Sequence, residues 1–278
     1  MSSRISPPLR RAQLGEALRE LRAARGLKLD EVAQKLGCSR GKVSNVENGH
    51  SLVTPGYVRD VLALYGADEP TQRRCIQLIM DARTEPWWKP YGKVLGDYVI
   101  YETEARVVRY WQTQVVPGLL QTLDYAREVI AADRPWEERG LVQLRARARI
   151  ARQALLSADD PPAVEAIIGE QALRQPFGGP QVMADQLGRL LEEAGRSTTS
   201  IRVLAGPVVM PSFVLYGMPD MPTVLYQESV DEIVDQAAAE FELRFEHLAA
   251  AALTPEESAD LIHAIREEFL QRADRGMA

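Results

Sequence analysis

The sequence predicts two domains: a small, all-helical amino-terminal domain of five helices, followed by a larger α+β domain. Up to Arg83, apolar residues recur with the helical period, and capping residues and glycines mark where the helices begin and end. The segment TEPWWKPYG at residues 84–92 interrupts this pattern, and beyond it β-branched segments lie between helical ones. A chain of 278 residues, 46% of them hydrophobic, is sufficient for two cores. We therefore expect a disordered leader over residues 1–9, a helical domain over 10–83 and an α+β domain over 84–278.

Residues 29–49, LDEVAQKLGCSRGKVSNVENG, carry the most specific pattern. Apolar side chains at i, i+3, i+4 and i+7 predict one buried helix face: Leu29, Val32, Ala33 and Leu36. Gly37 follows, where a left-handed residue ends the helix, and Ser39 is placed to cap a second one. Val43 and Val46 are expected to hold this second helix to the core. The segment thus predicts two short helices joined by a tight turn, which is the arrangement of a helix-turn-helix that enters the DNA major groove.

The phrase AQKLGCSRGKVSNVENG is similar to the lambda-repressor/Cro (Xre) family, whose helix pair ends in the same Glu-Asn-Gly. The resemblance implies a lambda-repressor-like fold for the amino-terminal domain. By position, it implies that four residues of the second helix contact bases: Arg40, Gly41, Ser44 and Asn45. It likewise implies phosphate contacts for Ser39, Lys42 and Asn48.

One position departs from the family. Lys28 stands where many members have the Ser or Thr that caps the first helix of the pair. Asp30 and Glu31 are therefore expected to favour that helix end mainly through the helix dipole. We expect this helix start to be weaker than in those members.

Three further helices are expected around the pair. One, over residues 9–24, precedes it. Thr54-Pro55 combines an N-cap with a proline at the first helical position, and the helix that it begins runs to Gly66. Asp68 is placed to cap the fifth helix, which completes the domain near residue 83.

The charge of the chain is unevenly distributed. Residues 1–83 contain 14 Lys and Arg against 9 Asp and Glu, a net charge of +5, whereas the remaining residues carry −11. A basic domain joined to an acidic domain is typical of a sequence-specific regulator and not of a protein that covers nucleic acid nonspecifically. The arginines of the first helix are candidate phosphate contacts, the alternative being a solvated charged face: Arg10, Arg11, Arg19, Arg22 and Arg25.

Beyond the boundary, Trp87 and Trp88 are expected to pack at the start of the second domain, because large apolar side chains favour burial. Strands are expected over residues 106–116, 163–169, 199–205, 212–216 and 223–228. Helices are expected over residues 123–132, 137–156 and 181–194, and two more complete the chain. The last of these is expected to begin with a capping box at Thr254 and Glu257.

Several phrases of this half, among them PWWKPYGKVLGDYVIYETEA, QVVPGLLQTLDYAREVI and LTPEESADLI, resemble the carboxyl-terminal domain of a large group of actinobacterial Xre regulators. Some members are described as antitoxin-like and paired with a small protein encoded next to them. Others are described as regulators of development or secondary metabolism. The resemblance implies a regulatory domain whose candidate partner is a small protein encoded nearby.

The sequence contains no recognisable catalytic constellation. GxSxG, Walker and HExxH motifs are absent, and the three histidines lack metal-ligand spacing, so we expect no enzymatic activity, no metal and no cofactor. Arg145, Arg149 and Arg152 fall on one face of an expected helix at i, i+4 and i+7. They could grip an anionic ligand or an acidic partner, the alternative being pairing with nearby Glu and Asp.

The remaining signals concern location. Two cysteines without a CxxC motif and an amino terminus without an apolar core indicate a reduced, cytoplasmic protein. The longest uncharged stretch, residues 203–219, is interrupted by prolines and glycines, which excludes a membrane span.

Together these observations predict a dimeric transcriptional regulator. A single helix-turn-helix contacts too few base pairs for strong discrimination, so a homodimer on double-stranded DNA with a pseudo-palindromic operator is expected. The second domain is expected to supply the dimer surface and to respond to a small partner protein or peptide. The alternatives are an antitoxin-like module whose main role is to hold a small protein, a metabolite-sensing regulator, and an enzyme fused to a DNA anchor.

Overall fold

The computed structural model describes residues 4–207, 209–227, 232–234 and 238–276. The chain divides into two compact units between Lys89 and Pro90. This division lies six residues after the boundary that we expected. Trp87 and Trp88 accordingly fall in the amino-terminal unit, where their half-buried rings meet edge to face with centroids 5.7 Å apart. The expectation that they begin the second domain is wrong.

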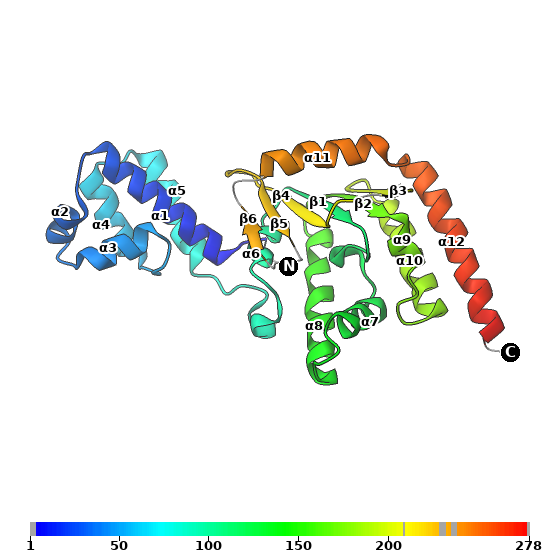
Figure 1. Cartoon of the computed structure of the whole chain (residues 1–278). Helices are drawn as coiled ribbons and strands as arrows, with labels where there is room; N and C mark the ends of the chain where they lie inside the picture. The colour runs from blue at the N-terminus through cyan, green and yellow to red at the C-terminus, as the bar shows by residue number, and fades with distance from the viewer. Residues whose placement is uncertain (1–3, 208, 228–231, 235–237, 277–278) are drawn as a thin grey trace. The chain divides into compact units, whose positions relative to one another are not determined.

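Residues 4–89 form the expected helical unit (Figure 1). Its helices are α1 (Pro7–Ala24), α2 (Leu29–Lys35), α3 (Arg40–Glu47), α4 (Pro55–Tyr65) and α5 (Glu69–Ala82). Three of the predicted caps are made: the backbone N–H groups of Lys42, Tyr57 and Thr71 donate to the side chains of Ser39, Thr54 and Asp68 at 3.2, 3.2 and 2.9 Å. Local capping chemistry therefore determines where α3, α4 and α5 begin.

The disordered leader expected over residues 1–9 is wrong for residues 7–9, because helix α1 begins at Pro7. Residues 1–3 lie outside the described part of the chain. Proline fits the first turn because its φ is fixed near the helical value and its missing N–H would have no partner there.

The start of α2 also differs from the expectation. The Glu31 carboxylate accepts a hydrogen bond of 2.7 Å from the backbone N–H of Lys28. Glu31 thus makes half of a capping box in addition to its effect on the helix dipole.

The core of this unit is formed by apolar side chains from all five helices. Its buried members include Leu14, Leu18, Val32, Ala33, Val43, Val46, Val58, Val61, Leu62, Tyr65, Cys75, Leu78 and Ile79. Burial raises the pKa of the Cys75 thiol above its ordinary value. Cys75 therefore serves as a small apolar core residue.

The second unit is the expected α+β domain. Its strands are β1 (Val107–Gln112), β2 (Ala163–Gly169), β3 (Thr199–Leu204), β4 (Phe213–Gly217), β5 (Val224–Gln227) and β6 (Glu232–Val234). Its α-helices are α6 (Tyr98–Glu102), α7 (Leu123–Asp133), α8 (Arg139–Ala151), α9 (Glu170–Arg174), α10 (Pro180–Ala194), α11 (Ala238–Ala251) and α12 (Pro255–Gly276). Short 3-10 segments span Lys89–Val94, Gly118–Leu120 and Arg152–Ser157.

The described strands form one mixed sheet in the order β3-β2-β1-β4-β5-β6. Strands β1, β2 and β3 are parallel, whereas β4, β5 and β6 are each antiparallel to the preceding neighbour in that order. The chain therefore leaves β3 at one edge and returns on the other side of β1. The strand order reverses at β1.

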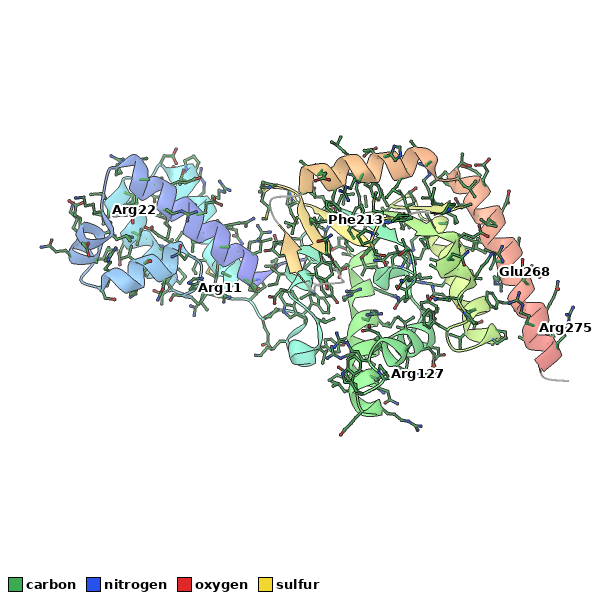
Figure 2. All side chains as sticks on the ribbon, viewed as in Figure 1. Arg11, Arg22, Arg127, Phe213, Glu268 and Arg275 are labelled. Carbon is green, nitrogen blue, oxygen red and sulfur yellow. The ribbon has the colours of Figure 1, made fainter. Side chains whose placement is uncertain are left out.

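Side chains alternate between the two faces of the sheet. Trp111, Phe213 and Leu215 face α11, where the rings of Phe213 and Phe241 meet at 4.9 Å. Figure 1 shows α11 on this face, and Figure 2 labels Phe213 beneath it. The opposite face packs on α10 and α12 through residues such as Val164.

Most predicted elements of this unit are confirmed, with shifted ends. The strand expected over 106–116 stops at Gln112, and the helix expected over 137–156 divides into α8 and a 3-10 turn at Arg152. The last residue of the strand expected over 223–228 lies outside the described residues. Helices α6 and α9 were not predicted, because five residues are too few to show a period.

The predicted capping box of α12 is confirmed. The Glu257 N–H donates to Thr254 Oγ1 at 3.2 Å, and the Thr254 N–H donates to Glu257 Oε2 at 2.9 Å.

Candidate nucleic-acid interface

Helix α3 is held to the helical core along one side only. Val43, Val46 and Glu47 are buried, whereas Arg40, Gly41 and Asn45 are exposed. Gly37, with φ of +62°, reverses the chain between α2 and α3, and only glycine adopts this conformation without strain. The turn and the apolar side together leave a polar helix face outward, as a groove-reading helix requires.

The residues that were expected to contact bases lie on this one helix. Arg40 is at its first position with 68% of its side chain exposed, and its Nε lies 3.8 Å from Asp30 Oδ1. Asp30 is itself 74% exposed, so this pair is weak and can exchange for another partner. Ser44 is half-buried and its Oγ accepts from Asn48 Nδ2 at 3.4 Å. Ser44 is thus less available to a ligand than Arg40 or Asn45.

The expected phosphate contacts of the motif also have intramolecular partners. The Ser39 hydroxyl accepts the Lys42 N–H in its capping role. The Lys42 ammonium lies 4.6 Å from the centroid of the Tyr57 ring. This cation–π contact holds the lysine beside the amino-terminal end of α3. Burial raises the pKa of Tyr57 to about 12.

The arginines of α1 are not a uniform solvated face. Arg10 donates to Gln13 Oε1 at 3.2 Å, and the backbone of Arg11 passes close to Gly49, which follows α3. Arg11 therefore lies near the carboxyl-terminal end of α3 and away from Arg40. Arg25 Nη2 donates to the Gly66 carbonyl at 3.0 Å, at the end of α4.

Arg22 has a structural role in place of the expected phosphate contact. Its Nε and Nη2 donate to the two carboxylate oxygens of Glu47, each at 2.8 Å, and its Nη1 donates to the Leu27 carbonyl at 2.9 Å. Only 17% of the Arg22 side chain and 5% of the Glu47 side chain are exposed. The hydrogen bonds with Glu47 raise the pKa of Arg22. This bidentate pair joins α1, on which Figure 2 labels Arg22, to the last residue of α3.

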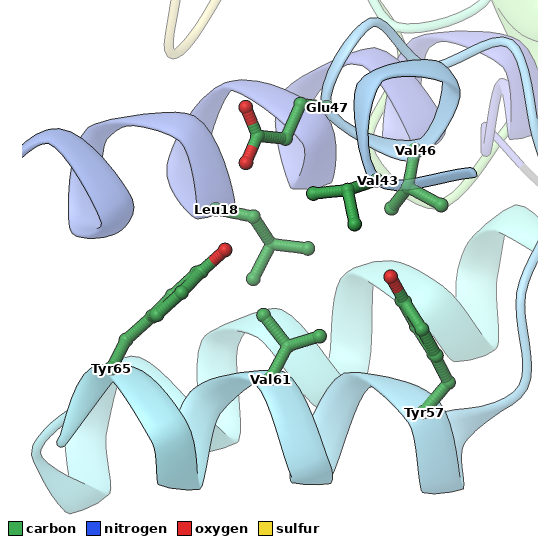
Figure 3. A pocket seen from close by; sticks show the side chains of 7 residues that line it. All are labelled: Leu18, Val43, Val46, Glu47, Tyr57, Val61 and Tyr65. Carbon is green, nitrogen blue, oxygen red and sulfur yellow. The ribbon is translucent and has the colours of Figure 1, made fainter. Parts of the chain in front are cut away.

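Figure 3 shows the Glu47 carboxylate above Leu18, facing Tyr65 and Val61 on α4. The space between these side chains has no room for a water molecule. Burial raises the pKa of Tyr65 well above its ordinary value, and the nearby Glu47 carboxylate contributes. The Glu47 charge is thus enclosed and depends on Arg22 for compensation.

Sequence reasoning missed two residues that position α3. They are Gly15, on α1, and Glu47, which pairs with Arg22. A Cβ at Gly15 would lie 2.6 Å from the Glu47 carbonyl oxygen and 2.7 Å from that of Val46. The sequence did contain a signal for each residue. A glycine inside a helical pattern lowers helix stability, so Gly15 suggested a packing reason, and Glu47 is the acidic residue of the Glu-Asn-Gly that ends the motif.

In the second unit, Arg145, Arg149 and Arg152 line one cavity of about 760 Å³. The expected pairing with acidic residues is found for two of them. Arg145 Nε donates to Glu137 Oε2 at 2.8 Å, and Arg152 Nε lies 3.4 Å from Glu102 Oε2. Arg149 Nη1 donates to Gln121 Oε1 at 2.9 Å. The structure therefore brings the three arginines together even though Arg152 lies beyond the end of α8.

Comparisons with known families identify both units. Residues 95–264 match the family described as "Domain of unknown function (DUF5753)", and residues 13–74 match the one described as "Helix-turn-helix domain". No curated protein and no solved structure matches the chain. The amino-terminal unit is thus a helix-turn-helix domain, which supports DNA binding by a transcriptional regulator.

Within the described residues, no helix has both the length and the apolar character needed to span a membrane.

Proposed function

Since the chain belongs to the family described as Domain of unknown function (DUF5753) and carries a helix-turn-helix domain ahead of the matched region, we propose that it is a sequence-specific transcriptional regulator of the Xre type. It binds a pseudo-palindromic operator as a homodimer, acts in the cytoplasm and catalyses no reaction. The polar, outward face of α3, with the largely exposed Arg40 at its first turn, is the observation that supports this proposal most directly. The bidentate Arg22–Glu47 pair also supports it, since it fixes the orientation of that helix.

The proposal includes control through the second unit. Its acidic balance, −11 after residue 83, and its resemblance to antitoxin-like regulators favour a small partner protein or peptide as the signal. Such a partner shifts DNA binding only by the difference in its affinity for the DNA-competent and DNA-incompetent states.

A second candidate is a metabolite-sensing regulator, and the cavity lined by Arg145, Arg149 and Arg152 favours it. Its volume is within the range of small-molecule sites. An antitoxin-like module that mainly holds a small protein is a third reading, supported only by the resemblance.

The proposed function is tested by incubating the full chain with the DNA directly upstream of its own gene and with a shuffled duplex of the same composition. We expect a complex of two chains per duplex on the upstream DNA, with far weaker binding to the shuffled one. Equal binding to both duplexes would refute sequence-specific regulation, and one chain per duplex would refute the dimer.

Replacing Arg40 by Ala should weaken operator binding by roughly 1 to 3 kcal/mol and relax base preference at one position of each half-site, because the exposed guanidinium can bind guanine through two hydrogen bonds. Selection from a randomised operator measures both effects. Lys42→Ala is the matched variant. It should weaken binding to all sequences alike and reduce the dependence of affinity on salt, as loss of a phosphate contact does. If Arg40→Ala keeps the parent's affinity and preference, α3 does not read the operator through this side chain.

Operator DNA should weaken the binding of a controlling partner protein by the same factor by which the partner weakens operator binding, since coupling between two sites is reciprocal. The small protein encoded next to the gene is the first to test, titrated onto the full chain with and without saturating operator. A partner affinity that is equal in both titrations would mean that the partner is held without switching DNA binding.

A further inference from the structure

The cavity of the second unit lies where the strand order of the sheet reverses. Gln112 and Thr113 line it at the carboxyl end of β1, and Ser212 lines it at the beginning of the neighbouring β4. In open α/β sheets, ligands commonly bind beyond the carboxyl ends of the parallel strands where the strand order reverses. The carboxyl end of β1 is such a position, although its neighbour β4 is antiparallel. The cavity is about 760 Å³, and small-molecule sites span roughly 300 to 1,000 Å³. Both its position and its size are those of a ligand site.

The cavity is positively charged within an acidic domain. Arg134, Arg145, Arg149 and Arg152 line it, whereas the acidic lining residues are Glu102 and Asp133. Glu137, which pairs with Arg134 and Arg145, adds one further negative charge beside it. The balance at the cavity remains positive, although residues 84–278 carry a net charge of −11. Charge of this sign in a concave site attracts anions.

The residues that line the cavity include a buried ion pair. Arg152 and Glu102 have side chains that are 6% and 1% exposed. The Arg152 guanidinium lies 4.9 Å from the Tyr98 ring centroid, and the Tyr110 hydroxyl donates to Glu102 Oε1 at 3.1 Å. Burial opposes the charge of Arg152, but the Glu102 carboxylate keeps the pKa of this arginine above its ordinary value. Burying two charges is costly for stability alone, so their retention at a cavity is consistent with a binding role.

Aromatic side chains form part of the wall, together with aliphatic residues such as Val115 and Ile130. Tyr98, Tyr110, Tyr216 and Tyr226 line the cavity, and the rings of Tyr98 and Tyr226 lie 5.1 Å apart. Aromatic faces bind planar rings by stacking, and large apolar contact areas favour a ligand with an unsaturated ring.

We infer that this cavity binds a small molecule that joins a planar ring to an oxyanion, with the ring against the tyrosines and the anion against Arg149 and Arg145. Both arginines line the cavity, and they lie on successive turns of α8. Arg145 already donates to Glu137 and to the Val94 carbonyl, and Arg149 donates to Gln121, so the anion would exchange with these partners. The inference deepens the second candidate function, a metabolite-sensing regulator, by naming the chemical class of the ligand that the cavity takes.

The test compares two fluorescent probes that differ only in the anion. 8-Anilinonaphthalene-1-sulfonate carries a sulfonate, and N-phenyl-1-naphthylamine is the same ring system without it. Titrated onto the full chain, the sulfonate should bind at one site per chain. Arg149→Gln should weaken the sulfonate on the order of tenfold and the neutral probe far less, because hydrogen bonds to charged groups are the strong ones.

Arg147→Gln is the matched control, since Arg147 is exposed on the same helix and does not line the cavity. It should leave both probes unchanged. Val214→Phe, which enlarges a buried side chain of β4 that lines the cavity, should weaken both probes, with circular dichroism confirming that each variant is folded. Equal effects of Arg149→Gln and Arg147→Gln, or undiminished binding of both probes to folded Val214→Phe, would overturn the assignment.

Competition against the bound sulfonate then separates two sources of the anion. If indole-3-acetate displaces the sulfonate probe, the site accepts a carboxylate. If adenosine monophosphate displaces it, the site accepts a phosphate. Either result supports the inference. Failure of both at millimolar concentration would overturn the proposed ligand class. Operator binding is measured separately, so loss of DNA binding by the parent would count against the proposed function alone.

Discussion

Replacing Arg22 by Met should lower the free energy of unfolding of the amino-terminal unit by about 3 kcal/mol, because the Glu47 carboxylate would remain enclosed without its partner. This value is at the lower end for buried pairs, since part of Arg22 is exposed. Hydrogen exchange of residues 7–82 in the full chain, followed by mass spectrometry, measures the stability of this unit alone. Operator affinity should fall as well, because Glu47 ends the helix that is proposed to read DNA.

Two comparisons isolate the ion pair. Combining Arg22→Met with Glu47→Met removes both charges and should restore part of the lost stability, since apolar replacement of a buried pair is often tolerated. Arg73→Met breaks an exposed pair with Glu69 and should leave exchange unchanged. An Arg22→Met chain that exchanges like the parent would show that the pair contributes little to the position of α3.

Gly15→Ala should destabilise the same unit by roughly 1 to 3 kcal/mol and reduce operator affinity beyond what the loss of folded protein explains. The added Cβ would lie 2.6 Å from the Glu47 carbonyl oxygen and 2.7 Å from that of Val46. Both contacts are with backbone atoms, so α1 and α3 must move apart. Denaturation and operator titration of the full chain measure the two effects.

Gly56→Ala is the control for this substitution. Gly56 lies in α4 of the same unit, and a Cβ there would meet only Thr54 Oγ1, at 3.7 Å. Alanine favours the helix, so a small gain in stability is expected. Should Gly15→Ala behave like Gly56→Ala, the close crossing of α1 and α3 does not require glycine.

The starts of α3, α4 and α5 were predictable because they depend on neighbours along the chain. The caps at Ser39, Thr54 and Asp68 act over three residues, and the turn at Gly37 depends on its own backbone conformation. The family resemblance then indicated which face of the second helix of the motif to assign to DNA. Two short helices and the exact ends of several strands could not be predicted, because so few residues show no period.

The sequence by itself thus determined the two-domain α and α+β organisation and the helix-turn-helix. Only the tertiary structure showed that Arg22 neutralises Glu47 rather than facing solvent, that Gly15 permits the approach of α1 to α3, and that Arg152 joins Arg145 and Arg149 at one cavity. Each of these depends on residues brought together from distant parts of the chain. An ion pair, a close helix crossing and a cavity all join residues that are far apart in the sequence. The local periodicity of the sequence does not specify which of these residues meet.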